Sequence, residues 1–334
     1  RAERVTAGLR WTRLLRGSVE FGTFSFTRPS LNLVRDSSGR WNLDRWLPPA
    51  RRDLAIRAPG AAVSGVPLGP PTTPPPPVRL NLVEFDDGRI DFKRGDDKLP
   101  FAFTQVSGKV EQVAPGRWTI EMEARPWRSG TLLQAAGRLR VRGDLAGTSA
   151  RLQPAEIHMH WGEASLADLV RLLRGQDYGL RGAVTVDGFA RSGSAAPGNS
   201  AAGALAGKLA SGAGEWTFHI EARAQRIHRW DLTERADNPA VNLLADGRWN
   251  IGTNEIRLAP TVLEAPHSNA RGEASYSPAT PASFEVRVES AGIQAADLLA
   301  WYRAFHGGVA EGLAAEGLLN STATLKGWPL QLQN

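Results

Sequence analysis

The sequence predicts a mainly β protein: an elongated, curved antiparallel sheet with a hydrophobic groove and a few short amphipathic helices, built from repeats. Apolar and polar residues alternate in many short segments, which turn residues separate at intervals of about 8 to 12 positions. One strand and helix also occur twice. Glu156-Ile157-His158-Met159 and Ala167-Asp168-Leu169-Val170 return as Glu285-Val286-Arg287-Val288 and Ala296-Asp297-Leu298-Leu299, 129 positions later (285 − 156). Such recurrence is typical of an extended scaffold.

Residues 1–57 are expected to form an N-terminal helix and a first strand hairpin. Apolar residues at near-helical intervals within residues 2–16 predict the short amphipathic helix. The period then changes to two. Phe24 and Phe26 mark one strand, Leu31 and Leu33 mark the next, and Arg28-Pro29 predicts the turn between them.

Two segments are expected to lie outside the sheet. Residues 58–77 contain eight prolines, which favour an extended polyproline conformation and predict a linker or loop. Residues 192–214 are almost entirely Gly, Ala and Ser, which predicts a flexible loop. These segments leave a first β-rich repeat at 78–191 and a second at 215–334. Within the first, Asp86-Asp87-Gly88 predicts a hairpin turn.

Each repeat is expected to contain one amphipathic helix. In the helix at 165–174, Ser165 and Asp168 form a capping box and Gly175 ends the helix. Its apolar stripe follows the spacing i, i+3, i+4, i+7 and consists of Leu166, Leu169, Val170 and Leu173. The counterpart at 294–305 has the stripe Leu298, Leu299, Tyr302 and Phe305. We expect each helix to cover part of the apolar side of the sheet.

The apolar strand positions are the candidate binding residues. If nothing in the protein fills the space above them, they form a water-free groove for hydrocarbon, and if a second layer covers them, they form the core of a closed sandwich. Periodicity leaves both alternatives open. The candidate groove residues are Phe24, Phe26, Leu31, Leu33, Leu80, Leu82, Ile90, Phe92, Phe101, Phe103, Trp118, Ile120, Met122, Ile157, Met159, Trp216, Phe218, Ile220, Phe284, Val286 and Val288.

Composition argues against several functions. Cysteine is absent, which excludes disulfides, thiolate metal sites and a cysteine nucleophile. The net charge is +6, but the 40 basic residues, 35 Arg and 5 Lys, are interleaved with 34 acidic ones and form no basic module, so nucleic-acid binding is not expected. No stretch reaches the roughly 18 apolar residues needed to span a bilayer. Because the chain begins with Arg1, we expect that it is a fragment.

Motifs for catalysis or cofactors are weak. His158 and His160 share one face of a strand and could ligate a metal, but no third ligand accompanies them, so we expect them to face solvent. Glu121 and Glu123 could be paired acid and base groups, yet such alternation is common on exposed strands. No phosphate loop and no G-x-S-x-G motif is present. We expect no enzyme activity, no metal and no cofactor.

One segment resembles a known family. It reads as a strand, a Pro, L-x-L-x-R, a turn Gly and W-N-L, and is similar to the N-terminal hallmark of the AsmA family. The matching residues are Phe24, Pro29, Leu31, Leu33, Arg35, Gly39, Trp41, Asn42 and Leu43. Residues 87–92 resemble the next segment of that family. The inserts at 58–77 and 192–214 depart from its pattern, and the N-terminal transmembrane helix of family members is missing here.

The resemblance implies a periplasmic envelope protein of a Gram-negative bacterium, anchored to the inner membrane through an N-terminal anchor absent from this fragment. Family members are similar to bridge-like lipid-transfer proteins, whose curled sheets hold acyl chains. The implied ligand is phospholipid or another acyl-chain lipid, and the implied role is in outer-membrane assembly and lipid homeostasis. The alternative is a structural scaffold that docks an envelope protein partner through an exposed sheet edge.

Overall fold

The computed structural model describes residues 1–9, 21–36, 42, 81–114, 116–148, 151–192, 215–250, 253–278, 283–306, 312–327 and 331–333. These residues form one sheet of 16 strands and two short helices, so the prediction of a mainly β fold is confirmed. The strands are β1 (Arg4–Leu9), β2 (Phe21–Thr27), β3 (Ser30–Arg35), β4 (Leu82–Arg94), β5 (Asp97–Ala114), β6 (Arg117–Arg128), β7 (Ala136–Thr148), β8 (Arg151–Ser165), β9 (Leu180–Ser192), β10 (Glu215–Arg229), β11 (Val241–Asn250), β12 (Ile256–Glu264), β13 (Asn269–Ser277), β14 (Ser283–Gln294), β15 (Leu318–Lys326) and β16 (Gln331–Gln333). The helices are α3 (Leu166–Arg174) and α5 (Ala295–His306).

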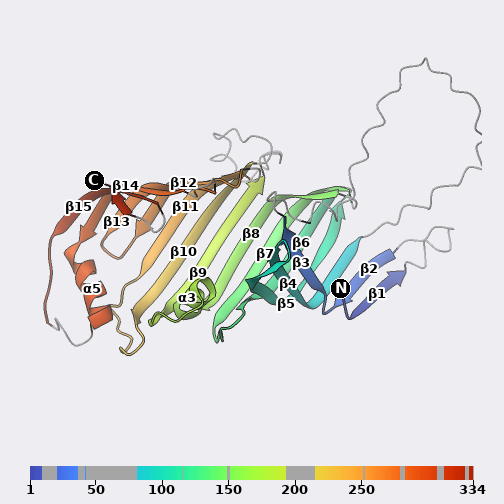
Figure 1. The fold of residues 1–334 in the computed structure, drawn as a ribbon, viewed down its shortest axis with the longest axis horizontal. Coiled ribbons are helices and arrows are strands. Elements are labelled where there is room, and N and C mark those ends of the chain that lie inside the picture. Colours follow the sequence, from blue (N-terminus) through green and yellow to red (C-terminus); the bar gives the residue numbers. More distant parts are fainter. Residues whose placement is uncertain are drawn as a thin grey trace, which may run out of the picture.

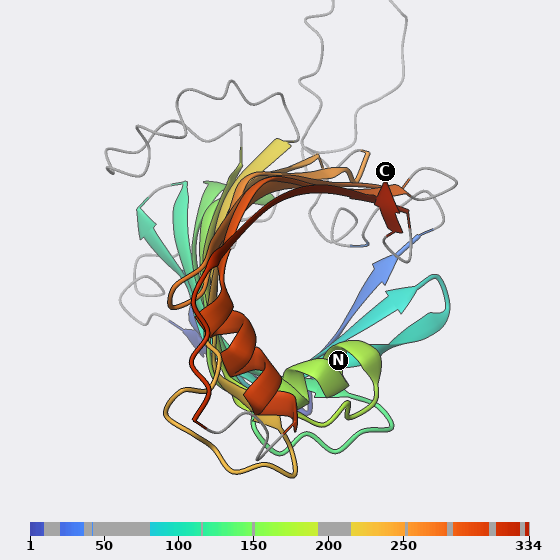
Figure 2. The same ribbon diagram turned by 90° about the vertical axis from the view of Figure 1, so that its left-hand side faces the viewer.

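Strand order follows the sequence almost without exception. From β4 to β16 every strand pairs antiparallel with its neighbours in the chain. Only β2 and β3 pair in parallel, and both pair with β4. The sheet curves without closing, with β1 at one end and β16 at the other (Figure 1). Seen along its length, the backbone of the sheet follows an arc (Figure 2).

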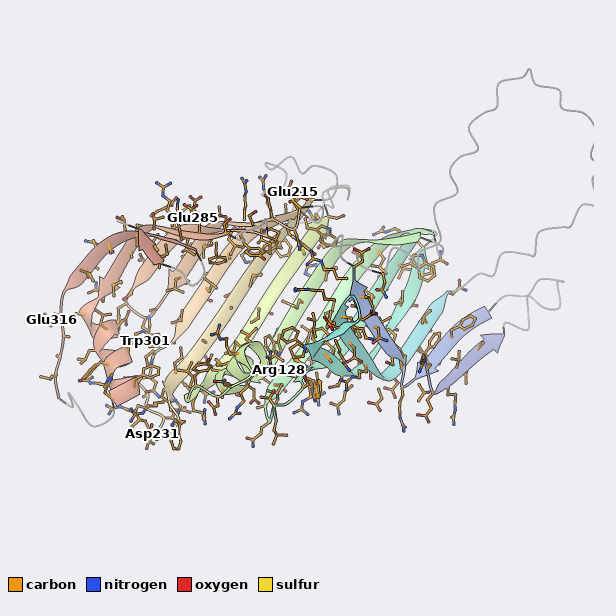
Figure 3. All side chains as sticks on the ribbon, viewed as in Figure 1. Arg128, Glu215, Asp231, Glu285, Trp301 and Glu316 are labelled. Atoms are coloured by element: carbon orange, nitrogen blue, oxygen red, sulfur yellow. The ribbon has the colours of Figure 1, made fainter. Side chains whose placement is uncertain are left out.

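Because consecutive strands are antiparallel, alternate connections lie on the same rim of the sheet. We call one of them the helix rim, since α3 and α5 both lie along it (Figures 1 and 2). It comprises residues 95–101, 129–135, 166–180, 230–240, 263–268, 295–306 and 312–319. Arg128 and Asp231 mark this rim in Figure 3, whereas Glu215 and Glu285 lie along the opposite rim.

Bulges contribute to the curvature of the sheet. Asp87 in β4, Gln105 in β5, Glu163 in β8 and Arg226 in β10 all have positive φ, at 51°, 51°, 59° and 55°. Each coincides with a shift in the register to a neighbouring strand. A bulge places two residues opposite one, which bends the strand and increases its twist. Curvature is therefore introduced within several strands.

Both predicted helices are present, within one residue of their expected bounds. In α3 the Ser165 side chain accepts from the Asp168 N–H, and Gly175 at φ 79° ends the helix, so the predicted caps are confirmed. The predicted apolar stripes are only partly correct. Leu173 is exposed in α3, and Leu298 and Tyr302 are exposed in α5. These side chains do not cover the sheet.

The N-terminal elements differ from the prediction. Residues Arg4–Leu9 form strand β1 and not a helix, because Val5 and Ala7 pair with Phe26 and Phe24 across the ladder. A short run of apolar residues fits both periods, and the sheet edge selects the strand. The predicted hairpin between the next two strands is also wrong, since β2 and β3 both pair in parallel with β4.

The turn predicted at residues 86–88 is wrong as well. Strand β4 continues through these residues to Arg94, and Asp87 is the extra residue of a bulge. The observed turn lies at Gly95 and Asp96. An Asp-Gly pair tolerates positive φ, which both a hairpin turn and a bulge require, so the local sequence fits either. The predicted linker at 58–77 and residues 193–214 of the predicted loop lie outside the described residues.

Candidate functional site: the apolar face of the sheet

A continuous row of apolar residues crosses the sheet from end to end. We call it the central apolar row; it takes one residue from each strand in the main order, and each residue is the register partner of the next. It consists of Ala7, Phe24, Val83, Val110, Ile120, Gly143, Ile157, Ala190, Phe218, Gly247, Leu258, Ala274, Val286, Leu325 and Leu332. None of these residues is polar. Since paired residues point to the same side of a sheet, those from Ala7 to Leu325 form one stripe.

The adjacent row, one residue along each strand, points to the other side and has the opposite chemistry. It runs through Thr23, Leu82, Glu111, Thr119, Asp144, Glu156, Arg191, Thr217, Arg248, Arg257, Ser275, Glu285 and Lys326. Only Leu82 in it is apolar. The sheet therefore has an apolar face and a charged face, as the alternation of the sequence predicts.

Most side chains of the apolar face are only half buried. Ile120, Ile157, Phe218 and Leu258 all have intermediate exposure. The largest fully buried side chains among the described residues are Trp118 and Asp168, and eight of the thirteen buried apolar residues are alanines. The described residues form a single unclosed sheet, so no second sheet covers this face. A closed sandwich is therefore not the arrangement of this part of the chain.

Glycines on the apolar face make room for large neighbours. A Cβ atom at Gly247 would lie 2.3 Å from Cζ of Phe218 and 2.9 Å from a methyl group of Leu258. At Gly143 it would lie 3.1 Å from Cγ2 of Ile120. The large side chains thus lie across the glycines of neighbouring strands. Alternation of large and small residues is expected where side chains converge on the inner side of a curved sheet.

Helix α3 lies over the helix-rim end of this face. Arg128, four residues after Ala124 on β6, points to the same side as the apolar row and donates from Nη1 to the carbonyl of Leu172, at 2.7 Å. The guanidinium thereby caps the C-terminus of the helix. It also lies 5.2 Å from the ring centroid of Phe101. In Figure 2, α3 lies on the inner side of the curved sheet.

A buried aspartate fixes each helix to a helix-rim loop two strands earlier in the chain, the loop before β7 for α3 and the loop before β13 for α5. Asp168 is 1% exposed; it accepts from the backbone N–H of Ala135 and from Nη1 of Arg171 at 2.8 Å. Asp297 is 6% exposed, and accepts from the backbone N–H of His267 at 3.0 Å and from the Ser268 hydroxyl. Both carboxylates thus accept from a backbone N–H of a helix-rim loop.

Nineteen of the twenty-one predicted groove residues lie on the apolar face according to the register. These are Phe24, Phe26, Leu31, Leu33, Ile90, Phe92, Phe101, Phe103, Trp118, Ile120, Met122, Ile157, Met159, Trp216, Phe218, Ile220, Phe284, Val286 and Val288. Leu82 lies on the charged face. The bulge at Asp87 reverses the alternation of side chains in β4, so that even-numbered residues point to opposite faces before and after it. Leu80 lies outside the described residues.

Sequence reasoning missed several residues of the same face. Val83 and Phe85 occupy the positions that Leu80 and Leu82 were expected to fill, and Val141 and Trp161 extend the stripe on β7 and β8. The alternation in the segment 138–142 was a signal that could have identified β7.

The polar candidates lie on the charged face, where they form ion pairs and hydrogen bonds. Arg138 donates to Glu123 at 2.7 Å, and this hydrogen bond holds the pKa of Glu123 below its ordinary value, so the carboxylate stays ionised. His158 and His160 contact Glu156 at 2.7 Å and Asp187 at 2.6 Å. No group of three or more potential metal ligands lies among the described residues.

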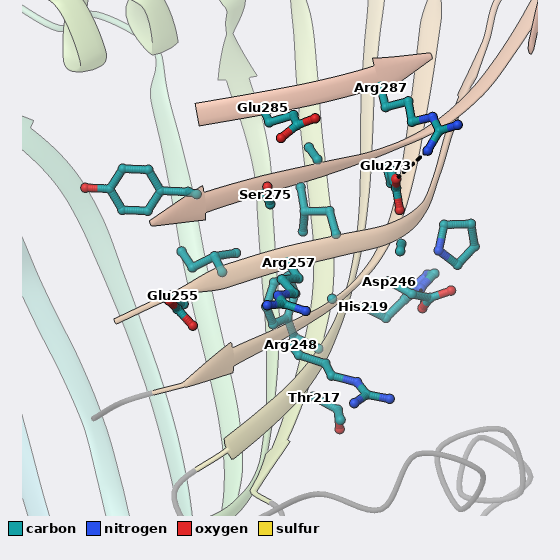
Figure 4. A pocket seen from close by; sticks show the side chains of 18 of the residues that line it. Thr217, His219, Asp246, Arg248, Glu255, Arg257, Glu273, Ser275, Glu285 and Arg287 are labelled. Atoms are coloured by element: carbon teal, nitrogen blue, oxygen red, sulfur yellow. Dashed lines mark hydrogen bonds and ion pairs between the residues drawn. The ribbon is translucent and has the colours of Figure 1, made fainter. Parts of the chain in front are cut away.

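One hollow lies over β10 to β14 and has a volume of about 1070 Å³. Its polar lining combines Arg248, Arg257 and Arg287 with acidic residues such as Asp246 and Glu273 (Figure 4). The guanidinium of Arg287 lies 3.9 Å from Glu273. Since both signs of charge are interspersed, this hollow has no strong preference for either anions or cations.

Comparison of the chain with protein-family models, with curated proteins and with solved structures gives no match. Neither helix in the described ranges is long and apolar enough to cross a membrane.

Proposed function

We propose that the apolar face lines a groove that holds the acyl chains of phospholipid or of another lipid, without enzymatic chemistry. The observation that supports this is the central apolar row, which crosses the whole sheet and contains no polar residue. At a strand spacing of about 4.8 Å, a row over 15 strands is roughly 65 Å long. That length exceeds any single lipid.

The energetics favour passage of lipid over tight storage. Transfer of one methylene from water to an apolar environment stabilises it by about 0.8 kcal/mol, and an open groove that covers half of the chain would supply about half of that. A bilayer supplies the full amount. A lipid in the groove is therefore stable relative to water but not relative to a membrane, which is what transport between two membranes requires.

We also propose that the sheet is built from two repeats, 78–191 and 215–334. Supporting this, α3 and α5 follow strands at matching positions, and Asp168 and Asp297 each accept from a backbone N–H of a helix-rim loop. With the AsmA-like segment, this arrangement supports an AsmA-like protein of the periplasm. An N-terminal inner-membrane anchor and a role in outer-membrane assembly and lipid homeostasis belong to the same proposal.

Two residues of β10, three positions apart, provide a matched test. Ile220 is on the apolar face and Thr217 is on the charged face. We expect Ile220→Asp to reduce the phospholipid recovered with the protein after incubation with vesicles and repurification, as measured by mass spectrometry, by at least about tenfold. Thr217→Asp should recover as much as the wild type. Absence of phospholipid from the wild-type protein, or equal loss in both variants, would refute the proposal.

The alternative function is a scaffold that docks an envelope protein through a sheet edge. The observation that favours it is strand β15, which pairs with β14 over Leu318–Ser321 but with β16 only at Thr324–Lys326. An edge with unpaired backbone groups can accept a further strand. Crosslinks from introduced residues at 319–321 to a protein partner, with no lipid bound, would favour this function.

A further inference from the structure

Eleven exposed large apolar side chains lie along the helix rim. Among the described residues two others, Val5 and Val113, lie elsewhere, and the connections of the opposite rim lie mostly outside the described residues. The most exposed are Leu132 at 78%, Trp230 at 64% and Leu173 at 63%. Monomeric soluble proteins expose single apolar residues in many places, but an accumulation of them along one rim marks an interaction surface.

These side chains are held outward by the fold. The backbone N–H of Trp230 donates to the carbonyl of Gly179 at 2.8 Å, and the indole lies against Gly179, where a Cβ atom would be 2.8 Å from Cδ1. Leu173 lies in the last turn of α3, which Arg128 and Gly175 cap. Trp230, and the helix turn that carries Leu173, therefore lose little conformational freedom on binding, which reduces the entropic cost of contact.

The charges of the same rim are largely paired with one another. Arg229 contacts Asp231 at 2.5 Å and Arg235 contacts Asp237 at 3.0 Å. Arg226 and Glu234 form a further pair at 3.3 Å. The loop between β10 and β11 consequently exposes Trp230 beside charges that cancel one another locally. Such a surface suits neither a strongly anionic nor a strongly cationic partner.

We propose that the helix rim lies lengthwise on the interfacial zone of a lipid bilayer, with Leu132, Leu173, Tyr178 and Trp230 inserted among the headgroups. Trp and Tyr favour this zone because each combines an apolar ring with a polar group. The eleven exposed side chains of the rim come from separate connections between the β4–β5 turn and the start of β15, about ten strand spacings or roughly 48 Å apart. A line of separate contacts fits a planar, fluid surface, whereas a protein partner of ordinary affinity buries a compact patch of about 800 Å² per side.

This inference does not depend on lipid in the groove, because surface contact uses the rim and not the apolar row. The two proposals are therefore separable. The Ile220→Asp variant should bind vesicles as the wild type does, even where it recovers no phospholipid after repurification.

The test is flotation with phosphatidylcholine vesicles, and separately with vesicles containing phosphatidylglycerol. We expect a triple variant, Leu132→Ser, Leu173→Ser and Trp230→Ser, to partition at least about 100-fold more weakly than the wild type. A control with Val5→Ser and Val113→Ser removes exposed apolar groups away from the rim and should stay within about twofold. Circular dichroism establishes that each variant is folded.

Salt dependence and accessibility complete the test. Binding to phosphatidylcholine should change less than about twofold between 50 and 500 mM salt, since the rim charges are paired. In vesicles with brominated acyl chains, the wild-type fluorescence should be quenched more than that of Trp230→Phe. The proposal is overturned if the wild type does not float, if the triple variant floats equally, or if binding needs anionic lipid and disappears with salt. Rim variants that lose only a protein crosslink would likewise overturn it.

Discussion

Removal of the Asp168 carboxylate should release α3 from the sheet. This side chain is 1% exposed and accepts from the backbone N–H of Ala135 and from Arg171. A hydrogen bond to a charged group contributes about 1.5–3 kcal/mol. In Asp168→Ala, Arg171 still pairs with Asp177, so the loss of its hydrogen bond to Asp168 costs only about 1 kcal/mol. The expected cost of Asp168→Ala is therefore about 3 kcal/mol.

Hydrogen exchange measured by residue or by peptide checks this value. A cost of about 3 kcal/mol corresponds to exchange about 100-fold faster in Leu166–Arg174, because 1.4 kcal/mol is a factor of ten. Helix α5, held by Asp297, serves as the internal reference and should keep its protection. Asp177→Ala is the matched control: it removes the more exposed partner of Arg171 and should accelerate exchange less than tenfold.

Two results would refute this reasoning. Unchanged exchange in α3 would mean that apolar contacts alone hold the helix against the sheet. Equal acceleration in α3 and α5 would mean that the loss is global and that the carboxylate does not act locally.

Three further predictions concern the sheet. Gly247→Val should destabilise the protein by about 1–3 kcal/mol in urea unfolding, because the new side chain collides with the ring of Phe218. The control Gly292→Ala should be near neutral, because its new methyl group makes only ordinary van der Waals contacts. A hydrogen bond from an arginine on β9 is the main reason that the pKa of Glu156 lies below 4.5, so the carboxylate stabilises the fold above pH 4.5 and this stabilisation is lost as the pH falls through the lowered pKa. Glu156→Gln should therefore lower the urea midpoint at pH 7 and make that midpoint less sensitive to acid. An equal acid slope in both proteins would contradict this. Asn42→Ala removes two side-chain hydrogen bonds to the backbone of β3 and should accelerate amide exchange in that strand about tenfold, with β8 unchanged as the reference.

The last of these predictions gives a structural role to Asn42. The Asn42 side chain accepts from the Val34 N–H at 3.1 Å and donates to the Asn32 carbonyl at 2.9 Å, while its backbone N–H donates to the Val34 carbonyl at 2.8 Å. One residue thus satisfies three backbone groups of β3. Satisfied edge groups cannot recruit another strand, which is one way in which proteins protect exposed sheet edges.

Local patterns predicted what local physics decides. The cap of α3 could be predicted because Ser165, Asp168 and Gly175 satisfy the helix ends within a few residues. The division of β6 into an apolar side with Ile120 and a charged side with Glu121 could be predicted because strand side chains alternate. Neither depends on distant parts of the chain.

The predictions were wrong where a single residue reverses the alternation of side chains along a strand, or where a partner strand decides between helix and strand. Asp87 acts as a bulge and not as a hairpin turn, and the bulge reversed the expected side of Leu82. Of the helix expected over residues 2–16, the part Arg4–Leu9 is a strand because β2 offers it a ladder, and residues 10–16 lie outside the described residues. The stripe that contains Leu298 was expected to cover the sheet, yet this side chain is exposed on the rim.

By itself, the sequence determined that strands alternate between apolar and charged sides and that two helices interrupt them, because period and capping are properties of neighbouring residues. Tertiary structure decided that the apolar sides join into one row over the whole sheet, that bulges bend this sheet, and that the helix rim carries the exposed side chains. These features depend on register between strands, and register is fixed by partners far apart in the chain.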